Sequence, residues 1–178
     1  IGDAGNTADW TGLGGVNYTY QISTYEVTVA QYTEFLNVVA ASDPNGLYNS
    51  SMETGPLGAF IVRSGKDGNY VYTVVAGKEN EPARYVTFYD ACRFCNWLSN
   101  GQGSGDTETG SYTLSLGVDI ARTANATWVL PTEDEWYKAA YYDPVNDAYY
   151  NYPNGSDTAT EPTDSTTTRE MIYGDSPY

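Results

Sequence analysis

Histidine is absent from this chain of 178 residues, and cysteine occurs only at Cys92 and Cys95. Without imidazole, the chain cannot build a His-based catalytic triad, a His-ligated copper, iron or zinc centre, or an imidazole acid–base pair. The C-x-x-C spacing alone is compatible with a redox pair or half of a zinc site. However, the sequence offers no second ligand pair, and both cysteines lie inside a predicted helix, where i,i+3 geometry strains a disulfide. We therefore expect buried structural thiols.

Basic residues are scarce, since 8 lysines and arginines stand against 23 acidic residues and give a net charge of -15. Such a surface repels nucleic-acid phosphates and anionic lipids, which disfavours nucleic-acid partners and binding to membrane surfaces. Long apolar runs are missing as well, because none approaches the roughly 20 residues that span a bilayer. We therefore expect no membrane insertion.

Tyrosine, with 18 copies, is abundant together with glycine, threonine, serine and asparagine. This balance is typical of secreted and cell-surface proteins and of tyrosine-rich binding surfaces. The chain starts at Ile1 without an initiator methionine or a signal peptide, so we expect that an upstream segment has been removed or left out. These features predict an extracellular or cell-surface location. The length predicts a single domain over residues 1–178.

Residues 128–142, WVLPTEDEWYKAAYY, place three carboxylates at the start of a predicted helix. Neighbouring helical positions lie about 100° apart, so Glu133 and Glu135 point to nearly opposite sides and are poor candidates for a shared catalytic site. Thr132 as the N-cap, with Glu135 three residues later, fits a capping box. We therefore interpret the acidic residues as the cap of the helix.

The same helix carries an apolar stripe, because Trp136, Ala139 and Ala140 occupy positions i, i+3 and i+4. This spacing predicts that the three side chains face the core. Asp134 and Lys138 lie four residues apart and predict an ion pair on the outer face. Replacing Trp136 is accordingly expected to open a core cavity.

Three patterns predict secondary structure earlier in the chain. The alternation of VNYTYQISTYEV at 16–27 predicts a strand that is buried on one face. Thr28 begins a predicted helix whose apolar repeat runs to the turn at 42–46. The β-prone runs at 59–63 and 69–75, separated by a glycine-containing turn, predict a hairpin.

Another predicted helix spans residues 86–101 and is capped by Thr87. A glycine-rich acidic loop at 101–110 leads from it to a short predicted strand at 112–116. The polar, threonine-rich segment 153–169 is typical of a surface loop or linker. Because strict alternation of strands and helices is missing, the fold class is an irregular α+β domain.

Three stretches together resemble the formylglycine-generating enzyme (sulfatase-modifying factor) domain family. They are YEVTVAQYTEFLN at 25–37, YVTFYDACRFCNWL at 85–98 and LPTEDEWYKAAYY at 130–142. Their order and spacing match the family pattern, and the resemblance covers about 25–142. The opening IGDAGNTAD also resembles exported bacterial members of the family.

The resemblance implies a C-type-lectin-like fold that is irregular and loop-rich, with a small antiparallel sheet and capped helices. Catalytic members are copper-dependent oxidases that convert a sulfatase cysteine to formylglycine with a cysteine pair from the C-terminal half. Related members are iron-dependent sulfoxide synthases, while many exported members bind ligands or build structures. Cys95 matches a family position that is often cysteine, and Cys92 lies where a small residue is common. Neither matches the copper-binding pair.

The C-terminal family motifs G-N-V-W-E-W, R-G-G-S-[WF] and G-F-R do not occur in this chain. The resemblance therefore implies the N-terminal part of an incomplete domain. We expect a non-catalytic extracellular binding or structural protein, without catalytic or cofactor-binding residues. The alternative is the N-terminal half of a copper-dependent formylglycine-generating oxidase acting on sulfatase cysteines. The expected partners are the missing C-terminal half or identical subunits in a homo-oligomer or filament, because open strand edges and apolar patches recruit partners.

Oxygen-bearing side chains cluster after the acidic helix at Asp143, Asn146 and Asp147. Hard cations take oxygen ligands, which makes these three residues candidates for a calcium site. Asp106 and Glu108, in the glycine-rich loop, form a second oxygen-rich cluster. The alternative is that Asp143 and the proline after it only stop the helix. Calcium is the one cofactor that the sequence suggests.

Overall fold

The computed structural model describes residues 1–158 except for 57 and 115–119. The described residues form helices and short strands that divide into two compact units. The central unit is Ser23–Leu130, and the terminal unit joins Ile1–Ile22 to Pro131–Tyr178. Helices with small antiparallel sheets confirm the α+β class, whereas the expectation of one domain over the whole chain stays a prediction.

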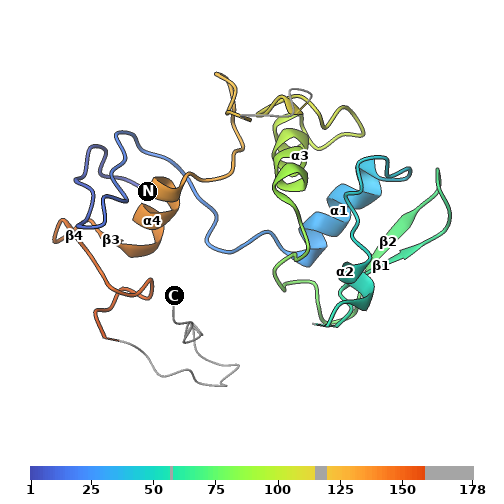
Figure 1. Cartoon of the computed structure of the whole chain (residues 1–178), viewed down its shortest axis with the longest axis horizontal. Coiled ribbons are helices and arrows are strands. Elements are labelled where there is room, and N and C mark those ends of the chain that lie inside the picture. The colour runs from blue at the N-terminus through green and yellow to red at the C-terminus, as the bar shows by residue number, and fades with distance from the viewer. Residues whose placement is uncertain (57, 115–119, 159–178) are drawn as a thin grey trace. The chain divides into compact units, whose positions relative to one another are not determined.

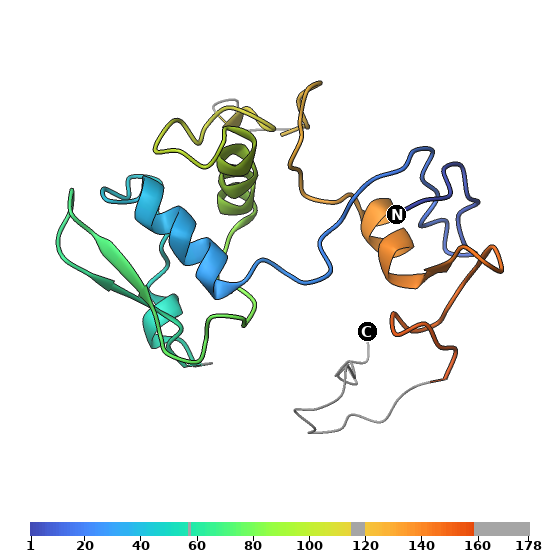
Figure 2. The ribbon, with the colours of Figure 1, turned by 180° about the vertical axis from the view of Figure 1, so that it is seen from behind.

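Three helices and a hairpin build the described part of the central unit. Its elements are α1 (Val29–Val39), α2 (Ser51–Thr54), β1 (Ile61–Ser64), β2 (Val71–Val74) and α3 (Phe88–Ser99). In both views of the chain, α1 lies between α3 and the hairpin (Figures 1 and 2). The two strands pair antiparallel, with Ile61 opposite Val74, so the predicted hairpin is confirmed.

Aromatic rings fill the core of the central unit. Tyr32 and Phe35 of α1 meet Phe94 and Trp97 of α3, and all four side chains are buried. The ring of Phe35 lies 5.4 Å from the rings of both Phe94 and Trp97. Such pairs add to the free energy gained by burying apolar area, so this cluster holds the two helices together.

All three long helices begin with the predicted threonine cap. Each threonine side chain accepts from the backbone N–H three residues later, and that residue's side chain accepts from the N-cap backbone. The pairs are Thr28 with Gln31, Thr87 with Asp90, and Thr132 with Glu135. Because both members of a box lie within four residues, the sequence alone specifies it.

The strand predicted at 16–27 is wrong. An extended segment becomes a strand only through a continuous ladder of backbone hydrogen bonds. Here the backbone bonds are scattered: Tyr20 exchanges two with Ile1 at 2.6 and 3.1 Å, while Val16 accepts from Gly5 at 2.8 Å and Val27 from Ala83 at 2.9 Å. The boundary between the units also falls in this segment, after Ile22. Of the strand predicted at 112–116, Tyr112 forms an isolated bridge with Arg122, and 115–116 lie outside the described residues.

The terminal unit contains helix α4 (Glu133–Tyr141), which continues directly into the short strand β3 (Tyr142–Asp143). This strand pairs antiparallel with β4 (Ala148–Tyr149). Of the predicted tail 153–169, the part beyond residue 158 lies outside the described residues. No helix among the described ranges is long and apolar enough to cross a membrane.

The buried face of α4 is not the predicted one. Trp136 is 51% exposed, whereas Glu135 and Lys138 are buried. Lys138 donates from Nζ to the backbone oxygen of Asp3 at 2.6 Å, and the Glu135 carboxylate accepts from the Tyr18 hydroxyl at 2.6 Å. The N-terminal loop thus covers the polar side of the helix, because it supplies a hydrogen-bonding partner for each polar group that it buries.

The ion pair predicted between Asp134 and Lys138 is also wrong. Lys138 is turned to the interior of the terminal unit, where its ammonium lies 5.4 Å from the ring centre of Tyr142. Asp134 instead accepts the backbone N–H of Gly14 at 3.0 Å. Each charged side chain therefore bonds to the N-terminal segment of the unit instead of to the other.

Candidate functional site

The three carboxylates at the start of α4 do not converge on a common site. Glu135 accepts the backbone N–H of Thr132 at 2.7 Å and also holds Tyr18, while Asp134 holds Gly14. Glu133 is exposed. The predicted capping box of Thr132 and Glu135 is confirmed.

Cys92 and Cys95 are free thiols on α3, and both are buried. They pack in a small hydrophobic cluster with Tyr112 and Leu114. Burial raises the pKa of Cys92 to about 11 and that of Cys95 to about 12. The prediction of buried structural thiols is confirmed. Copper(I) needs thiolate or imidazole ligands, so two protonated, enclosed thiols do not fit a copper site.

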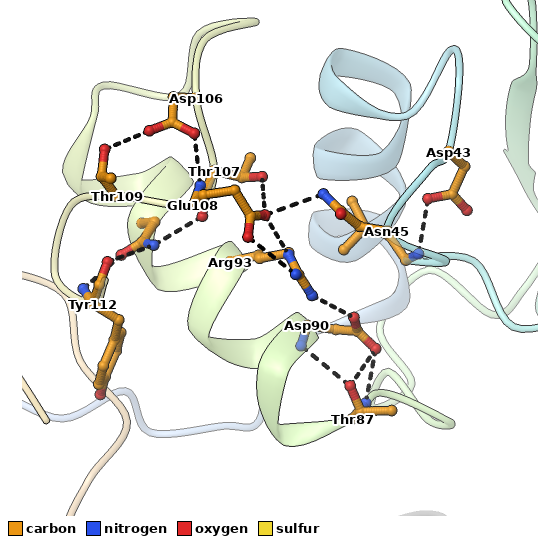
Figure 3. A network of polar contacts seen from close by, with 12 residues as sticks. Asp43, Asn45, Thr87, Asp90, Arg93, Asp106, Thr107, Glu108, Thr109 and Tyr112 are labelled. Atoms are coloured by element: carbon orange, nitrogen blue, oxygen red, sulfur yellow. Dashed lines mark hydrogen bonds and ion pairs between the residues drawn. The ribbon is translucent and has the colours of Figure 1, made fainter. Parts of the chain in front are cut away.

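The acidic loop after α3 is tied to the helix by charge (Figure 3). Arg93 donates from Nε to Glu108 Oε1 at 2.6 Å, and its Nη1 lies 3.6 Å from Asp90 Oδ1. Asp106 accepts the backbone N–H of Glu108 at 2.8 Å and the hydroxyl of Thr109. The Asp106 and Glu108 side chains thus serve the structure of the loop.

The calcium candidates Asp143, Asn146 and Asp147 lie in one turn after α4, and both carboxylates already accept hydrogen bonds. Asp143 accepts from the Val145 backbone at 2.9 Å and from the Asn146 amide at 2.7 Å. Asp147 accepts from the Tyr142 hydroxyl at 2.9 Å. The helix stop accounts for this arrangement. The calcium site stays a prediction, and a melting scan before and after dialysis against a chelator tests it.

A cleft in the terminal unit has aromatic walls and a volume of about 210 Å³. We call it the tyrosine cleft. The residues that line it are Asp9, Trp10, Tyr137, Tyr141, Tyr149, Tyr150 and Asn151. Small-molecule sites are concave and lined mainly by apolar and aromatic side chains with a few polar groups. This cleft is therefore the candidate functional site.

Trp10 stands at the tip of a turn that Asp9 builds. The Asp9 carboxylate accepts the backbone N–H of Thr11 at 2.7 Å, and the Asp9 backbone oxygen accepts the N–H of Gly12 at 3.0 Å. Aspartate favours such turns because its side chain substitutes for a backbone acceptor. The turn leaves the indole of Trp10 92% exposed.

Three tyrosine rings form one continuous wall of the cleft. The Tyr137 ring lies 4.7 Å from that of Tyr141, one turn along α4, and 5.6 Å from that of Tyr149 on β4. Gly14 permits this packing, because its φ is +86° and a Cβ there would lie 2.5 Å from the Tyr149 hydroxyl. The Asn6 amide then donates to that hydroxyl at 2.6 Å.

Carboxylates hold two further hydroxyls of the cleft. Tyr137 donates to Asp9 Oδ2 at 2.5 Å, and Tyr150 donates to Asp143 Oδ2 at 2.8 Å. Desolvation raises the pKa of Asp9, but hydrogen bonds from Thr11 and Tyr137 outweigh it and hold the pKa below its ordinary value. Both carboxylates are therefore ionised at neutral pH, beside rings whose faces are themselves electron-rich.

The larger cavity of the central unit, about 450 Å³, is a shallower candidate. Its polar wall includes Asp43, Asp67 and Arg63. The Arg63 guanidinium carbon lies 4.6 and 4.4 Å from the ring centres of Tyr48 and Tyr70. The guanidinium of Arg63, the one basic group that lines this cavity, thus already contacts two tyrosine rings of the protein itself.

The sequence patterns above predict none of the residues in the tyrosine cleft. Two signals were available: D-W-T-G at 9–12 is typical of a tight turn with tryptophan at its tip, and tyrosines crowd 137–152. Neither signal says that the two segments meet, since Asp9 and Tyr137 are 128 residues apart.

Comparison with known proteins gives one match. A family model described as the Sulfatase-modifying factor enzyme 1-like domain matches residues 16–174, which include most of both units. No curated protein and no solved structure matches the chain.

Proposed function

This chain belongs to the Sulfatase-modifying factor enzyme 1-like domain family, and from that premise we propose that it is a non-catalytic binding domain that works outside the cell. The observation that carries the proposal is the tyrosine cleft, with its exposed Trp10. An exposed indole costs solvation free energy that contact with a ligand would recover. The cleft offers aromatic side chains for binding.

The state of the two thiols supports a non-catalytic role. Oxidation of a client cysteine in the catalytic branch of the family requires reactive thiols, and the thiolate is the reactive form. Burial raises the pKa of Cys92 and Cys95 to about 11 and about 12, so both are protonated at neutral pH. The rival proposal, the N-terminal half of a copper-dependent oxidase, would need a cysteine pair other than this one.

The finer features of the proposal come from the family resemblance and the composition. The resemblance supports a C-type-lectin-like fold, and the composition rich in tyrosine, threonine, serine and asparagine supports export. Partners remain the C-terminal half of the domain or identical subunits. Exposed aromatic side chains such as Phe88 and Trp128, 55% and 56% exposed, support association. Light scattering tests it, and a monomer at high concentration would contradict it.

Two measurements separate binding from catalysis. Incubation with a sulfatase-derived cysteine peptide and copper is expected to leave the peptide mass unchanged, and conversion to formylglycine would overturn the proposal. A screen of small water-soluble compounds by ligand-observed NMR is expected to give hits that Trp10→Ala abolishes. The control is Trp128→Ala, which removes another exposed tryptophan, 56% exposed and in the central unit, and should keep the hits. An empty screen would contradict the binding role.

A further inference from the structure

We propose that the tyrosine cleft binds an organic cation that carries a quaternary or otherwise alkylated ammonium group, an inference that rests on the proposed binding function. The geometry points to this class because five aromatic side chains and a carboxylate line the cleft. Aromatic faces attract cations through the ring quadrupole, and aromatic cages are a recurrent means of recognising alkylated ammonium groups.

The internal hydrogen bonds of the cleft disfavour a neutral polar ligand such as a sugar. The hydroxyls of Tyr137, Tyr149 and Tyr150 are bonded within the protein, at 2.5 Å to Asp9, 2.6 Å to Asn6 and 2.8 Å to Asp143. A ligand that depends on hydroxyl contacts would have to break these bonds. A quaternary ammonium has no N–H group, so it needs only ring faces and nearby negative charge.

Asp9 and Asn151 supply two further polar groups of the cleft that are engaged in the same way. Asp9 Oδ1 accepts from the Thr11 backbone at 2.7 Å, and the Asn151 amide donates to Asp157 at 3.2 Å. Hydrogen bonding leaves the charge of Asp9 in place while using its acceptor sites. The cleft therefore combines negative charge with three tyrosine hydroxyls that are already hydrogen-bonded within the protein, and an alkylated cation matches both properties.

The charge of the terminal unit favours a cation strongly. Its one basic side chain among the described residues, Lys138, is 1% exposed and points inward to the backbone of Asp3. The acidic side chains of the same described residues are Asp3, Asp9, Glu133, Asp134, Glu135, Asp143, Asp147 and Asp157. Such a field concentrates cations at the surface and accelerates their association.

The size and the internal precedent agree with this ligand class. A volume of about 210 Å³ exceeds the roughly 150 Å³ cavity that is known to hold benzene, so a trimethylammonium group has room. The chain also uses tyrosine faces for a cation elsewhere, since the guanidinium of Arg63 lies between Tyr48 and Tyr70. In the tyrosine cleft no cationic side chain of the described residues fills the equivalent place.

Choline and 3,3-dimethylbutan-1-ol form a matched pair for the test, because they share a shape and differ in charge. Titration of the whole chain, followed by the indole N–H signal of Trp10 in NMR spectra, should show saturable binding of choline. We expect the neutral alcohol to bind about tenfold more weakly, as the loss of cation–π attraction predicts. Sodium chloride at equal ionic strength controls for screening.

Variants assign the effect to the cleft. Tyr141→Leu, followed by the remaining cleft signals, should weaken choline binding about tenfold, whereas Trp128→Ala should leave it unchanged. Equal affinity for the neutral alcohol would overturn the cation inference and leave the binding function standing. Compound-screen hits in the cleft without any response to choline would likewise overturn the cation inference and leave the binding function standing. Absence of both choline binding and screen hits would remove the binding function as well.

Discussion

The hydroxyl of Tyr137 donates to Oδ2 of Asp9 across 2.5 Å, although 128 residues separate the two in the sequence. The bond joins helix α4 to the turn that carries Trp10. One contact thus links the helix that forms a wall of the tyrosine cleft to the loop that presents its most exposed ring. The bond also contributes to the lowered pKa of the Asp9 carboxyl.

Tyr137→Phe removes this bond and keeps the ring. We expect a loss of about 1 kcal/mol in the free energy of unfolding at neutral pH. Asp9 loses a donor, so its pKa should rise toward 3.8, the ordinary value. A lowered carboxylate pKa stabilises the fold above the unfolded pKa, and that stability is lost as the pH falls through the folded pKa. The two proteins should therefore converge in urea unfolding at acid pH, and a constant difference would contradict this account.

Phe35 and Trp136 provide a paired test of where the core lies. Phe35 is fully buried among aromatic rings, so Phe35→Ala should cost about 3–5 kcal/mol through lost burial and a cavity. Trp136 is 51% exposed, so Trp136→Ala should cost about 1 kcal/mol or less. Chemical denaturation of both variants measures the difference. Equal losses would mean that Trp136 belongs to a core after all.

Asn96 is a buried polar residue whose side chain forms hydrogen bonds with backbone groups of Thr107 and Tyr112. Its amide donates to the backbone oxygens of Thr107 and Tyr112, at 2.8 and 3.0 Å, and its oxygen accepts the Tyr112 N–H at 2.8 Å. Asn96→Ala leaves three buried groups unpaired and should cost about 3 kcal/mol. Asn80→Ala, at an exposed position, is the control that should leave the melting temperature unchanged.

The two thiols should be silent toward alkylation in the folded protein. At about pH 8, iodoacetamide should label neither Cys92 nor Cys95 until urea unfolds the chain, because only the thiolate reacts. A raised thiol pKa stabilises the fold below the unfolded pKa of 9.0. That contribution is lost as the pH rises toward about 11 for Cys92 and about 12 for Cys95. Rapid native labelling, read by intact mass, would show that a thiol is accessible.

Local interactions were open to prediction because both partners lie within a few residues. The capping boxes at Thr28, Thr87 and Thr132 each close over three residues, and their helices follow as predicted. The hairpin between Ile61 and Val74 is local in the same sense. The apolar repeat of the helix that begins after Thr28 likewise predicts one apolar side. Phe35 lies on that side, and it is buried because other apolar residues pack against it.

Long-range packing decided what periodicity could not. Helix α4 has both an apolar side at Trp136 and a polar side at Lys138, and the pattern predicted burial of the first. The N-terminal loop buries the second, because the backbone oxygen of Asp3 is placed to receive the ammonium. A sequence pattern ranks side chains by hydrophobicity but cannot supply the distant acceptor that makes burial of a charge tolerable.

The sequence by itself determined the family, the three capped helices, the hairpin and the enclosure of the thiols. Only the tertiary structure decided that Asp9 and Tyr137 meet, and with them the existence of the tyrosine cleft. The physical reason is the range of the interactions. A cap is stabilised within one turn of chain, whereas the cleft forms only when segments more than a hundred residues apart pack together, as the Tyr137 separation of 128 shows.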